Sequence, residues 1–319
     1  MSKLLQILSL GTSLSEHDVL RIARNAPVRY KTYPIEKRKG GTRIISQPAR
    51  ELKALQRILA SELLSTLPVH PAAMAYRPNV SIRANAEAHA GNGPILKYDF
   101  KDFFPSITSS DWQNYCRTNN IFDNADDLWI STNIFFQRPF GSARLTLAIG
   151  APSSPPLSNI LMREFDTRIA DLVAQESVTY TRYADDLTFS ARRTGYLTGV
   201  DRSLKRLLRQ MRSPSLVLNP SKTVRATTKY KRFVTGLVLA NDGAVSLGHE
   251  RKRKIRAALH HEKMGKLDVQ RRVELAGLLA FVKDVEPQFL AKLEAKYGSI
   301  LIHRINTAKA PQRNERARF

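Results

Sequence analysis

Apolar and polar residues alternate on both sides of the stretch Ala184-Asp185-Asp186. Val178 and Tyr180 precede it and Leu187 and Phe189 follow it, each apolar residue being separated from its partner by a polar one. A period of two indicates β-strands with one buried face. The pattern predicts a β-hairpin with two adjacent carboxylates at its turn.

The same period occurs further upstream. Leu96, Tyr98 and Phe100 fall on one face of a predicted strand, and Lys97 and Asp99 fall on the other. A proline a few residues later ends the pairing. Asp99 is therefore a third carboxylate near a strand end, and it can meet the hairpin turn if the two strands are neighbours in one sheet.

Spacings of three and four residues predict helices along much of the remaining chain. Helices are predicted over 1–25 with Ser15 as a cap, from Pro48 to Leu67, over much of 111–148, from Pro155 to Leu172, over 200–212, and in several segments after 250. A hairpin is predicted over 28–47, single strands over 216–218 and 233–239, and a loop over 85–93. Helices combined with an antiparallel sheet indicate an α+β fold.

The net charge of the chain indicates which class of molecule it binds. The 319 residues carry 51 Lys and Arg against 28 Asp and Glu, a net charge of +23, of which residues 201–319 hold +17. Such an excess indicates a polyanionic partner, either nucleic acid or an anionic membrane surface. The longest apolar run, 275–282, is far shorter than the roughly 20 residues of a membrane span. Cys116 is the only cysteine, which excludes an intramolecular disulfide and a cysteine cluster for zinc. We expect a cytoplasmic protein with no membrane partner.

The three carboxylates allow two interpretations. Asp is common in turns because it tolerates turn geometry, and this explanation needs no function. Alternatively, Asp99, Asp185 and Asp186 hold divalent cations with help from the Phe100 carbonyl, because Mg²⁺ prefers oxygen ligands. Two ions about 3.5–4 Å apart clamp the attacking and leaving oxygens of a phosphoryl displacement. Mn²⁺ is an alternative ion.

Other segments suit a nucleotide substrate, although most also have a purely structural explanation. The basic, glycine-rich tip 37–41 can close over a triphosphate as a lid, or it is a solvated turn. Small residues and prolines over 149–159 allow close approach of a substrate backbone, or they cap a helix. Phe104 presents an apolar wall that would exclude a 2′-hydroxyl. The stretch Arg251-Lys252-Arg253-Lys254 can contact phosphates, or it is a solvated helix face.

Three of these stretches resemble, in the right order, the motifs of reverse transcriptases. Lys97–Ser106 resembles the first metal-binding motif, Gly150–Pro155 the template and nucleotide loop, and Tyr183–Asp186 the signature hairpin. Asn85-Ala86-x-x-His89 and Val234-Thr235-Gly236 further resemble two motifs of bacterial retron reverse transcriptases.

The resemblance covers residues 28–300 and implies a right-hand polymerase fold. The fingers would cover 26–90 and 113–148, and the palm, with an antiparallel sheet and helices, would cover 91–112 and 149–245. A basic helical thumb would follow over 246–306. An N-terminal helical segment, 1–25, would precede these parts, and a flexible basic tail, 307–319, would end the chain.

The resemblance also implies residue roles by position. Asp99, Asp185 and Asp186 would hold two Mg²⁺, and Lys222 would protonate the departing pyrophosphate. Nucleotide contacts would come from Arg43, Phe104, Gly150 and Ala151, and RNA contacts from Asn85, His89, Val234, Thr235, Gly236, Arg251, Lys252, Arg253 and Lys254. The loop departs from the family at Ile149, where glutamine is usual, and this bears on substrate affinity and fidelity.

The implied activity is RNA-templated DNA synthesis from deoxynucleoside triphosphates. Retron enzymes start at a 2′-hydroxyl of a structured noncoding RNA and copy part of it into a branched RNA–DNA hybrid (msDNA). Many serve antiphage defence with an effector or toxin protein. Two alternatives stay open: another reverse transcriptase, of the group II intron or diversity-generating kind, and an RNA-binding scaffold that sequesters a toxin without polymerising. The carboxylate trio argues against the scaffold, and the 85–89 and 234–236 motifs argue against the other reverse transcriptases.

Overall fold

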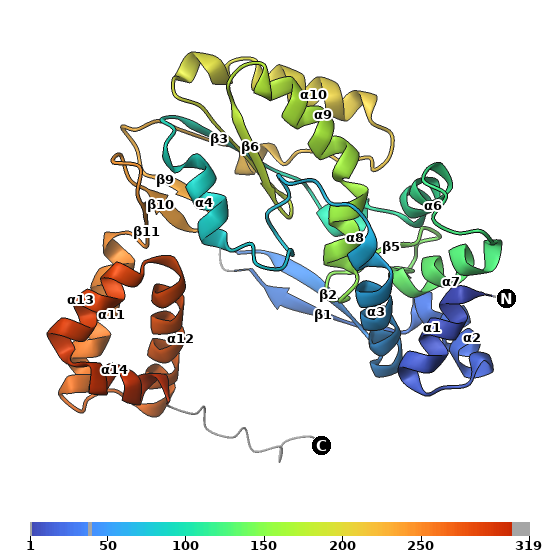
Figure 1. The fold of residues 1–319 in the computed structure, drawn as a ribbon, viewed down its shortest axis with the longest axis horizontal. Helices are drawn as coiled ribbons and strands as arrows, with labels where there is room; N and C mark the ends of the chain where they lie inside the picture. Colours follow the sequence, from blue (N-terminus) through green and yellow to red (C-terminus); the bar gives the residue numbers. More distant parts are fainter. Residues whose placement is uncertain (1, 38–39, 308–319) are drawn as a thin grey trace. The chain divides into compact units, whose positions relative to one another are not determined.

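The computed structural model describes residues 2–37 and 40–307, which form two compact units (Figure 1). The first unit runs up to Val80 and continues over Pro94–Arg225, and the second combines Ser81–Gly93 with the residues from Ala226 onward. None of the helices within these described ranges is long and apolar enough to cross a membrane.

A four-stranded sheet forms the centre of the first unit. Its strands are, in order, β6 (Thr179–Tyr183), β7 (Asp186–Ser190), β3 (Ile95–Asp99) and β8 (Val224–Ala226). Both β6 and β3 pair antiparallel with β7, which confirms the predicted hairpin and its predicted neighbour. Directly paired residues share a face, so Tyr98 and Leu187 lie on one face while Asp99 and Asp186 lie on the other.

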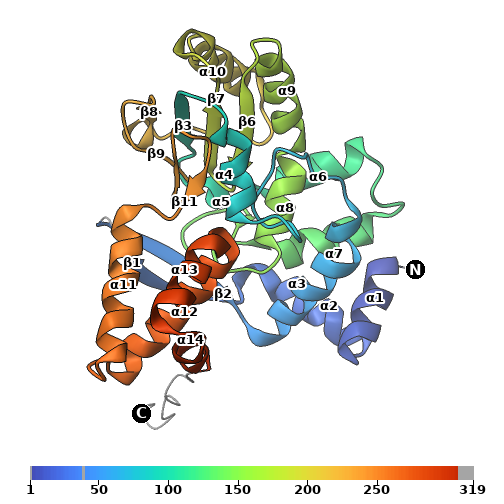
Figure 2. The ribbon, with the colours of Figure 1, turned by 60° about the vertical axis from the view of Figure 1, so that its left-hand side comes forward.

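Two helices, α9 (Arg163–Ala174) and α10 (Val200–Gln210), lie along one face of this sheet, as Figure 2 shows. The Tyr180 hydroxyl donates to Asp166 on α9 at 2.8 Å, and the Tyr98 hydroxyl donates to Asp201 on α10 at 2.9 Å. Phe189 packs between these two rings, with centroid distances of 5.0 and 6.1 Å. The apolar face is therefore the covered one, and the carboxylates point to the opposite side.

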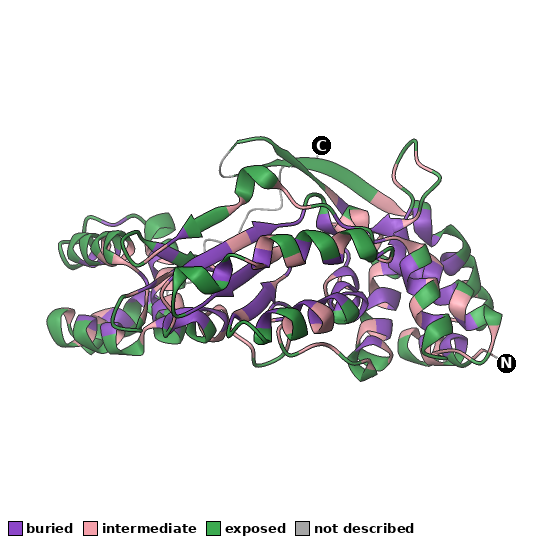
Figure 3. Cartoon of the chain, turned by 90° about the horizontal axis from the view of Figure 1, so that it is seen from above, coloured by how far each residue is buried: buried purple, intermediate pink, exposed green. Residues whose placement is uncertain are grey.

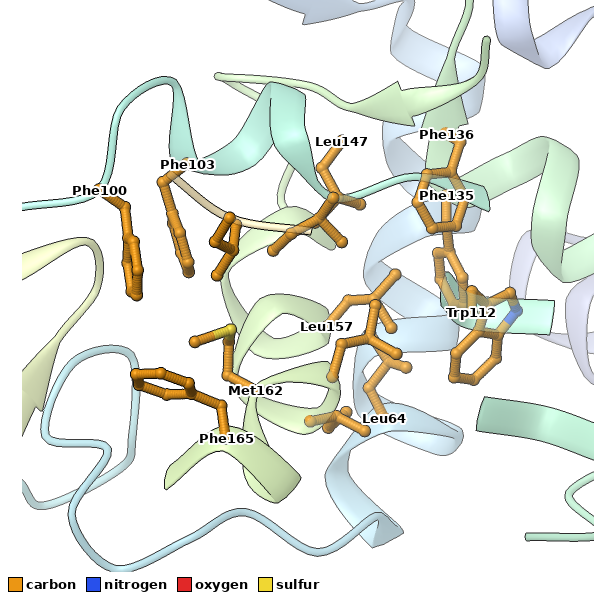
Figure 4. Packing of buried hydrophobic residues seen from close by; sticks show 14 of the residues in the cluster. Leu64, Phe100, Phe103, Trp112, Phe135, Phe136, Leu147, Leu157, Met162 and Phe165 are labelled. Atoms are coloured by element: carbon orange, nitrogen blue, oxygen red, sulfur yellow. The ribbon is translucent and has the colours of Figure 1, made fainter. Parts of the chain in front are cut away.

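Helices also build the rest of the first unit. They are α1 (Lys3–Thr12), α2 (Glu16–Asn25), α3 (Arg50–Glu62), α5 (Phe103–Ser106), α6 (Ser109–Thr118), α7 (Ala125–Phe135) and α8 (Ser154–Leu161). As predicted, Ser15 caps α2, because its hydroxyl accepts a hydrogen bond from the Asp18 N–H. Their apolar sides share one core with the sheet, and Figure 4 shows it passing from Trp112 through Leu157 to Phe165.

The first unit also carries two smaller hairpins. β1 (Tyr30–Glu36) and β2 (Thr42–Pro48) form the predicted basic hairpin, and it is largely exposed (Figure 3). The tip residues Arg38 and Lys39 lie outside the described residues. β4 (Phe136–Gln137) and β5 (Thr146–Leu147) form a short buried pair.

The second unit joins one short helix to a small sheet and four further helices. Its elements are α4 (Ile82–Ala90), the sheet β9 (Arg232–Val234), β10 (Leu237–Leu239) and β11 (Val245–Ser246), and then α11 (His249–Lys263), α12 (Val269–Val285), α13 (Pro287–Tyr297) and α14 (Ser299–Asn306). Buried Arg232 donates to the carbonyls of Asn92, Gly93 and Ala240. These bonds fasten the end of α4 to the sheet, although the two segments are far apart in sequence.

The loop predicted over 85–93 is wrong, because residues 82–90 form α4. Ser81 caps this helix by accepting a hydrogen bond from the Ala84 N–H at 3.1 Å, and alanine, at every second position over 84–90, favours helix. Asn85 and His89 are consequently one helical turn apart and share a face.

Two predicted strands also need correction. Residues 233–239 make two strands, β9 and β10, because Thr235 and Gly236 have φ values of +48° and +80° and reverse the chain between them. Residues 216–218 are no strand, and Leu218 makes only an isolated bridge to Phe100. Nearby prolines, which cannot donate to a ladder, keep that segment from pairing further.

Helix boundaries differ slightly from the prediction. Pro48 ends β2 instead of opening a helix, and α3 ends at Glu62, before Leu67. Met162 separates α8 from α9, so the helix predicted from Pro155 to Leu172 is two helices.

Candidate active site

Two of the three carboxylates are direct cross-strand partners. Asp99 ends β3 and pairs with Asp186, which begins β7. Asp185 lies in the turn before it, after Ala184, whose φ of +58° lets the chain reverse sharply. Like charges directly opposite each other destabilise a sheet. The pairing therefore has an electrostatic cost that a bound cation would remove.

Two lysines act as counter-charges for these carboxylates. Lys222 Nζ lies 2.7 and 2.9 Å from the two carboxylate oxygens of Asp99, and Lys97 Nζ lies 2.9 Å from Asp186 Oδ2. The Asn219 N–H donates to the Asp99 carbonyl at 2.7 Å, which holds the turn carrying Lys222 against β3. Lys222 thus lies beside the carboxylates, and so does Lys97, which was not predicted as a site residue.

The third carboxylate is the one whose ionisation the fold opposes. Burial raises the pKa of Asp185 above its usual range, and the charge of Asp99 raises this pKa further, while Lys222 lowers it. The Phe100 N–H donates to the Asp185 carbonyl at 3.0 Å, so Phe100 also lies at this end of the sheet. Without a cation, the site disfavours a third negative charge.

The donor set fits a hard divalent cation. Mg²⁺ takes carboxylate oxygens together with water and substrate phosphates. Among the described residues, no three His, Cys, Asp or Glu side chains stand ready as a ligand cluster, and two of these carboxylates are instead held by ammonium groups. An ion at this point would take over the role of a lysine as the counter-charge of Asp99 or Asp186.

A buried arginine supports the turn from the covered face. The side chains of Arg182 and Asp166 are both 0% exposed, and Arg182 Nη2 lies 2.6 Å from Asp166 Oδ2. Nη1 of Arg182 donates to Asn159 Oδ1 and to the Ala184 carbonyl, each at 3.1 Å. Asn159 in turn donates to the Ala75 carbonyl at 2.7 Å. This network fixes the turn to α8 and to the segment around residue 75.

That segment brings an aromatic residue to the site. Its backbone follows β6, because the Met74 N–H donates to the Arg182 carbonyl at 2.7 Å. The Tyr76 ring lies 6.4 Å from the ring of Phe104, and burial and the charge of Asp185 raise the pKa of Tyr76. Phe104, the predicted wall, therefore stands with Tyr76 near the carboxylates. Sequence reasoning missed Tyr76, because its segment has no periodic pattern.

The loop resembling a nucleotide-binding motif is fastened to the exposed hairpin. Gly150 has a φ of +124°, and a Cβ atom on it would lie 2.9 Å from the Ser46 carbonyl oxygen. The Ser46 N–H donates to the Ile149 carbonyl at 2.8 Å. Only glycine permits this approach. Buried Ala151 follows, and the exposed Arg43 of β2 is close enough to lower the pKa of Tyr76.

The residues predicted to contact RNA all lie in the second unit. Asn85, His89 and Val234 are buried. The Thr235 hydroxyl donates to the Ile82 carbonyl at 3.0 Å, so the turn of the β9–β10 hairpin packs on the start of α4. The two motifs, separated by more than 140 positions, are therefore parts of one substructure.

The four basic residues at the start of α11 differ in how available their side chains are for contact with phosphates. Lys252 pairs with Glu286 and lies over the Phe289 ring. Arg251 stacks on Phe281 at 5.2 Å. Arg253 and Lys254 are exposed, and Lys254 pairs with Glu250 at the helix surface. The exposed pair is the part of this stretch best suited to phosphate contacts.

Comparison with known proteins agrees with this geometry. Residues 35–256 match the family model described as reverse transcriptase (RNA-dependent DNA polymerase). The Retron Ec83 reverse transcriptase of Escherichia coli is 35% identical, over 93% of this chain and 96% of its own. The Retron Ec86 reverse transcriptase of Escherichia coli is 32% identical, over 94% of this chain and 92% of its own. A telomerase structure from Candida albicans aligns with 87% of this chain and 60% of its own, at 13% identity and a TM-score of 0.49. From the family match and the two curated relatives, the chain belongs to the retron reverse transcriptases and is an RNA-directed DNA polymerase with an α+β fold of the right-hand type.

Proposed function

We propose that this polymerase copies part of a cognate structured noncoding RNA into DNA, starting from a 2′-hydroxyl of that RNA and leaving a branched RNA–DNA hybrid (msDNA). Its similarity to retron enzymes over nearly its full length supports this. The observation that carries the catalytic part is the direct pairing of Asp99 with Asp186 beside Asp185. The proposed setting is the cytoplasm, in antiphage defence with an effector or toxin protein.

In the proposed reaction, Asp99, Asp185 and Asp186, with the Phe100 carbonyl, hold two Mg²⁺. When bound, such ions lower the pKa of the attacking hydroxyl and neutralise the charge that develops on the phosphates. The protein supplies position: the cross-strand pair fixes two ligands, and the Arg182 network holds the turn that carries the third. Mn²⁺ suits the same oxygen ligands.

The remaining residues act on the nucleotide. Lys222, held at Asp99 before substrate arrives, gives a proton to the departing pyrophosphate. Arg43 contacts the triphosphate, and Gly150 and Ala151 allow the backbone to approach the base pair. Phe104 excludes a 2′-hydroxyl, which favours deoxynucleotides.

We further propose fingers, palm and thumb with the boundaries predicted from the sequence. The central sheet lies within the proposed palm and α11–α14 form the proposed thumb. The two compact units divide the chain differently, because residues 81–93 fold with the segment that begins at residue 226.

Primer extension tests the catalytic proposal. Replacing Asp185→Asn together with Asp186→Asn should abolish deoxynucleotide incorporation on a primed RNA template, while RNA binding stays near wild type. The control replaces two exposed acids elsewhere, Asp126→Asn with Asp171→Asn, and should extend normally. Near wild-type extension by the first variant would rule the mechanism out.

Sequencing the nucleic acid that copurifies with the wild-type protein tests the retron-level proposal. A branched molecule, with DNA joined to an internal 2′-oxygen of RNA, is the expected product, and it should be absent from the Asp185/Asp186 variant. Linear RNA alone would favour an RNA-binding scaffold. Linear complementary DNA of varied sequence would favour another kind of reverse transcriptase.

A further inference from the structure

The second unit has a hollow whose aromatic lining has no role so far, although Gly236, Arg251 and Lys254 on its wall were predicted to contact RNA. It has a volume of about 670 Å³ and is lined by the 228–231 turn, the β9–β10 hairpin, the start of α11 and one residue of α12. All of these elements belong to the same unit, so the hollow is a property of that unit alone. Its size matches a site for one or two small planar groups.

Aromatic and aliphatic side chains form its apolar part. Tyr230 and Phe233 line the hollow and are 71% and 45% exposed, and Val238, Leu247 and Leu278 add aliphatic surface. A hollow lined by rings and aliphatic side chains together with a few charged groups is typical of a binding site. Flat rings of this kind are the surfaces on which unpaired nucleobases stack.

Cations surround this apolar part. Lys229, Lys231, Arg251 and Lys254 line the hollow, against one carboxylate, that of Glu250. Lys254 is paired with Glu250. Lys229 and Lys231, on either side of Tyr230, make no ion pair with any residue the structure describes. Lys231 is nevertheless near enough to Glu250 to help lower the pKa of that carboxyl. Ammonium groups on either side of an exposed ring match a phosphate on each side of a stacked base.

Hydrogen bonds to backbone carbonyls hold the turn that carries Tyr230. The Tyr230 N–H donates to the Thr227 carbonyl at 2.9 Å, and Asn241 donates to the Thr228 carbonyl at 3.2 Å. Arg251 reaches the Gly236 carbonyl at the other wall. A turn whose backbone is already held in place needs less ordering on binding, which favours affinity.

We propose that this hollow binds an unpaired stretch of RNA, with one base stacked on Tyr230 or Phe233 and the adjacent phosphates at Lys229 and Lys231. Single-stranded RNA is favoured over a duplex, because paired bases are stacked on each other and their faces are not free. The inference rests on the proposed RNA-copying function and adds the RNA form that is held and the residues that hold it.

Equilibrium binding of the full chain to fluorescent RNA tests this. The probes are an unstructured 12-nucleotide RNA and a blunt duplex of equal length, in buffer without divalent ions. Tyr230→Ala or Phe233→Ala should weaken single-strand binding by about 5- to 100-fold, the range for loss of one base stack. Tyr230→Phe, which keeps the ring, should bind as wild type does. Duplex affinity should change less than threefold in all three variants.

A matched control removes an exposed tyrosine elsewhere. Tyr196 is 45% exposed in the first unit, and Tyr196→Ala should leave both affinities unchanged. Unchanged single-strand affinity in both alanine variants would overturn the proposal. Equal losses for single strand and duplex would overturn it too, because they would show contact with the phosphates alone.

Extension of a supplied RNA–DNA primer-template separates this inference from the catalytic proposal. Tyr230→Ala should still extend that substrate at saturating concentration, whereas the Asp185/Asp186 variant should not. An active Asp185/Asp186 variant would contradict the carboxylate mechanism and leave the hollow's role standing. A Tyr230→Ala protein that fails on this substrate while binding the single strand normally would contradict the inference alone.

Discussion

At the scale of single residues, Asp185 is an active-site carboxylate whose ionisation lowers the free energy of unfolding of the metal-free protein. Its raised pKa means that the folded state holds this proton more tightly than the unfolded chain does. Folding stability therefore falls as pH rises from the usual Asp range through the raised pKa, because the unfolded state then loses its proton first. At neutral pH without metal, the folded protein bears this cost in full.

Asp185→Asn should consequently raise the melting temperature of the metal-free protein at pH 7, by a few degrees, and reduce the fall in stability above pH 4. Thermal unfolding with a chelator, compared between pH 4 and pH 7, measures this. Added Mg²⁺ should stabilise the wild type more than the variant, because ligand binding to the folded state alone stabilises it. A variant less stable than wild type at pH 7 under chelation would contradict the electrostatic account.

Lys222 gives a second residue-scale prediction. Its ammonium group neutralises Asp99 in the free enzyme and donates a proton during catalysis in our proposal. Lys222→Met should lower kcat by about 100-fold or more, the usual contribution of a general acid, with a much smaller effect on KM. Lys97→Met, which removes the other counter-charge but no proton donor, should lower kcat far less. If Lys222→Met and Lys97→Met lower the single-turnover rate of incorporation equally, Lys222 is not the general acid.

At the scale of elements, the Arg182 network joins three segments that carry active-site residues. It holds the Ala184 turn, α8 behind the Gly150 loop, and the segment that leads to Tyr76. Removing one partner of a buried ion pair costs about 3–5 kcal/mol, so Arg182 itself is a poor probe of catalysis. Asn159 is a better one, because the ion pair with Asp166 survives its loss.

Asn159→Ala should lower kcat by about tenfold and raise the Mg²⁺ concentration needed for half-maximal rate, since the turn loses one of its supports. The matched control is Ser131→Ala, which removes a buried hydrogen bond from Trp112 in the same unit. If both variants lose similar stability but only Asn159→Ala changes the metal requirement, the positioning role holds. The same metal dependence in both would refute it.

The strands β3 and β7 that carry the carboxylates could be predicted from the sequence, whereas the Arg182 network and the helix α4 could not. Alternation around Asp99 and Asp186 gave both strands and their shared face, because a half-buried sheet imposes that pattern. Arg182 was missed because a charged strand residue suggests exposure, and its partner Asp166 lies on another element. The helix α4 was missed because Asn85 and His89 interrupt its apolar face, and only the fold shows that both are buried.

At the scale of the whole molecule, some basic side chains form contacts within the protein and others face solvent, where they can bind phosphates. Lys252 is tied to Glu286 inside the second unit, whereas Arg253 and Lys254 face solvent on the same helix. A chain with a net charge of +23 attracts RNA through all its exposed cations, so no single one dominates. Because Lys252 is tied inside the unit while Arg253 and Lys254 face solvent, replacing these neighbours should affect stability and RNA affinity differently.

Arg253→Ala with Lys254→Ala should weaken RNA binding for every sequence and reduce the slope of log affinity against log salt by about 0.7 per charge. Lys252→Ala should instead lower the melting temperature and leave that slope nearly unchanged. Affinity measured over a salt series, beside thermal unfolding, distinguishes them. Interchanged phenotypes would contradict the division of roles drawn from side-chain exposure, which is 19% for Lys252 and 71% for Lys254.

The most direct test of the central claim is a count of bound metal ions. Mn²⁺ titration followed by electron paramagnetic resonance, with primer-template and a non-hydrolysable deoxynucleotide present, should find two ions per wild-type chain. Asp99→Asn and the Asp185/Asp186 double variant should each lose at least one of them, together with extension activity. Full Mn²⁺ occupancy in either variant would contradict a metal site formed by these three carboxylates.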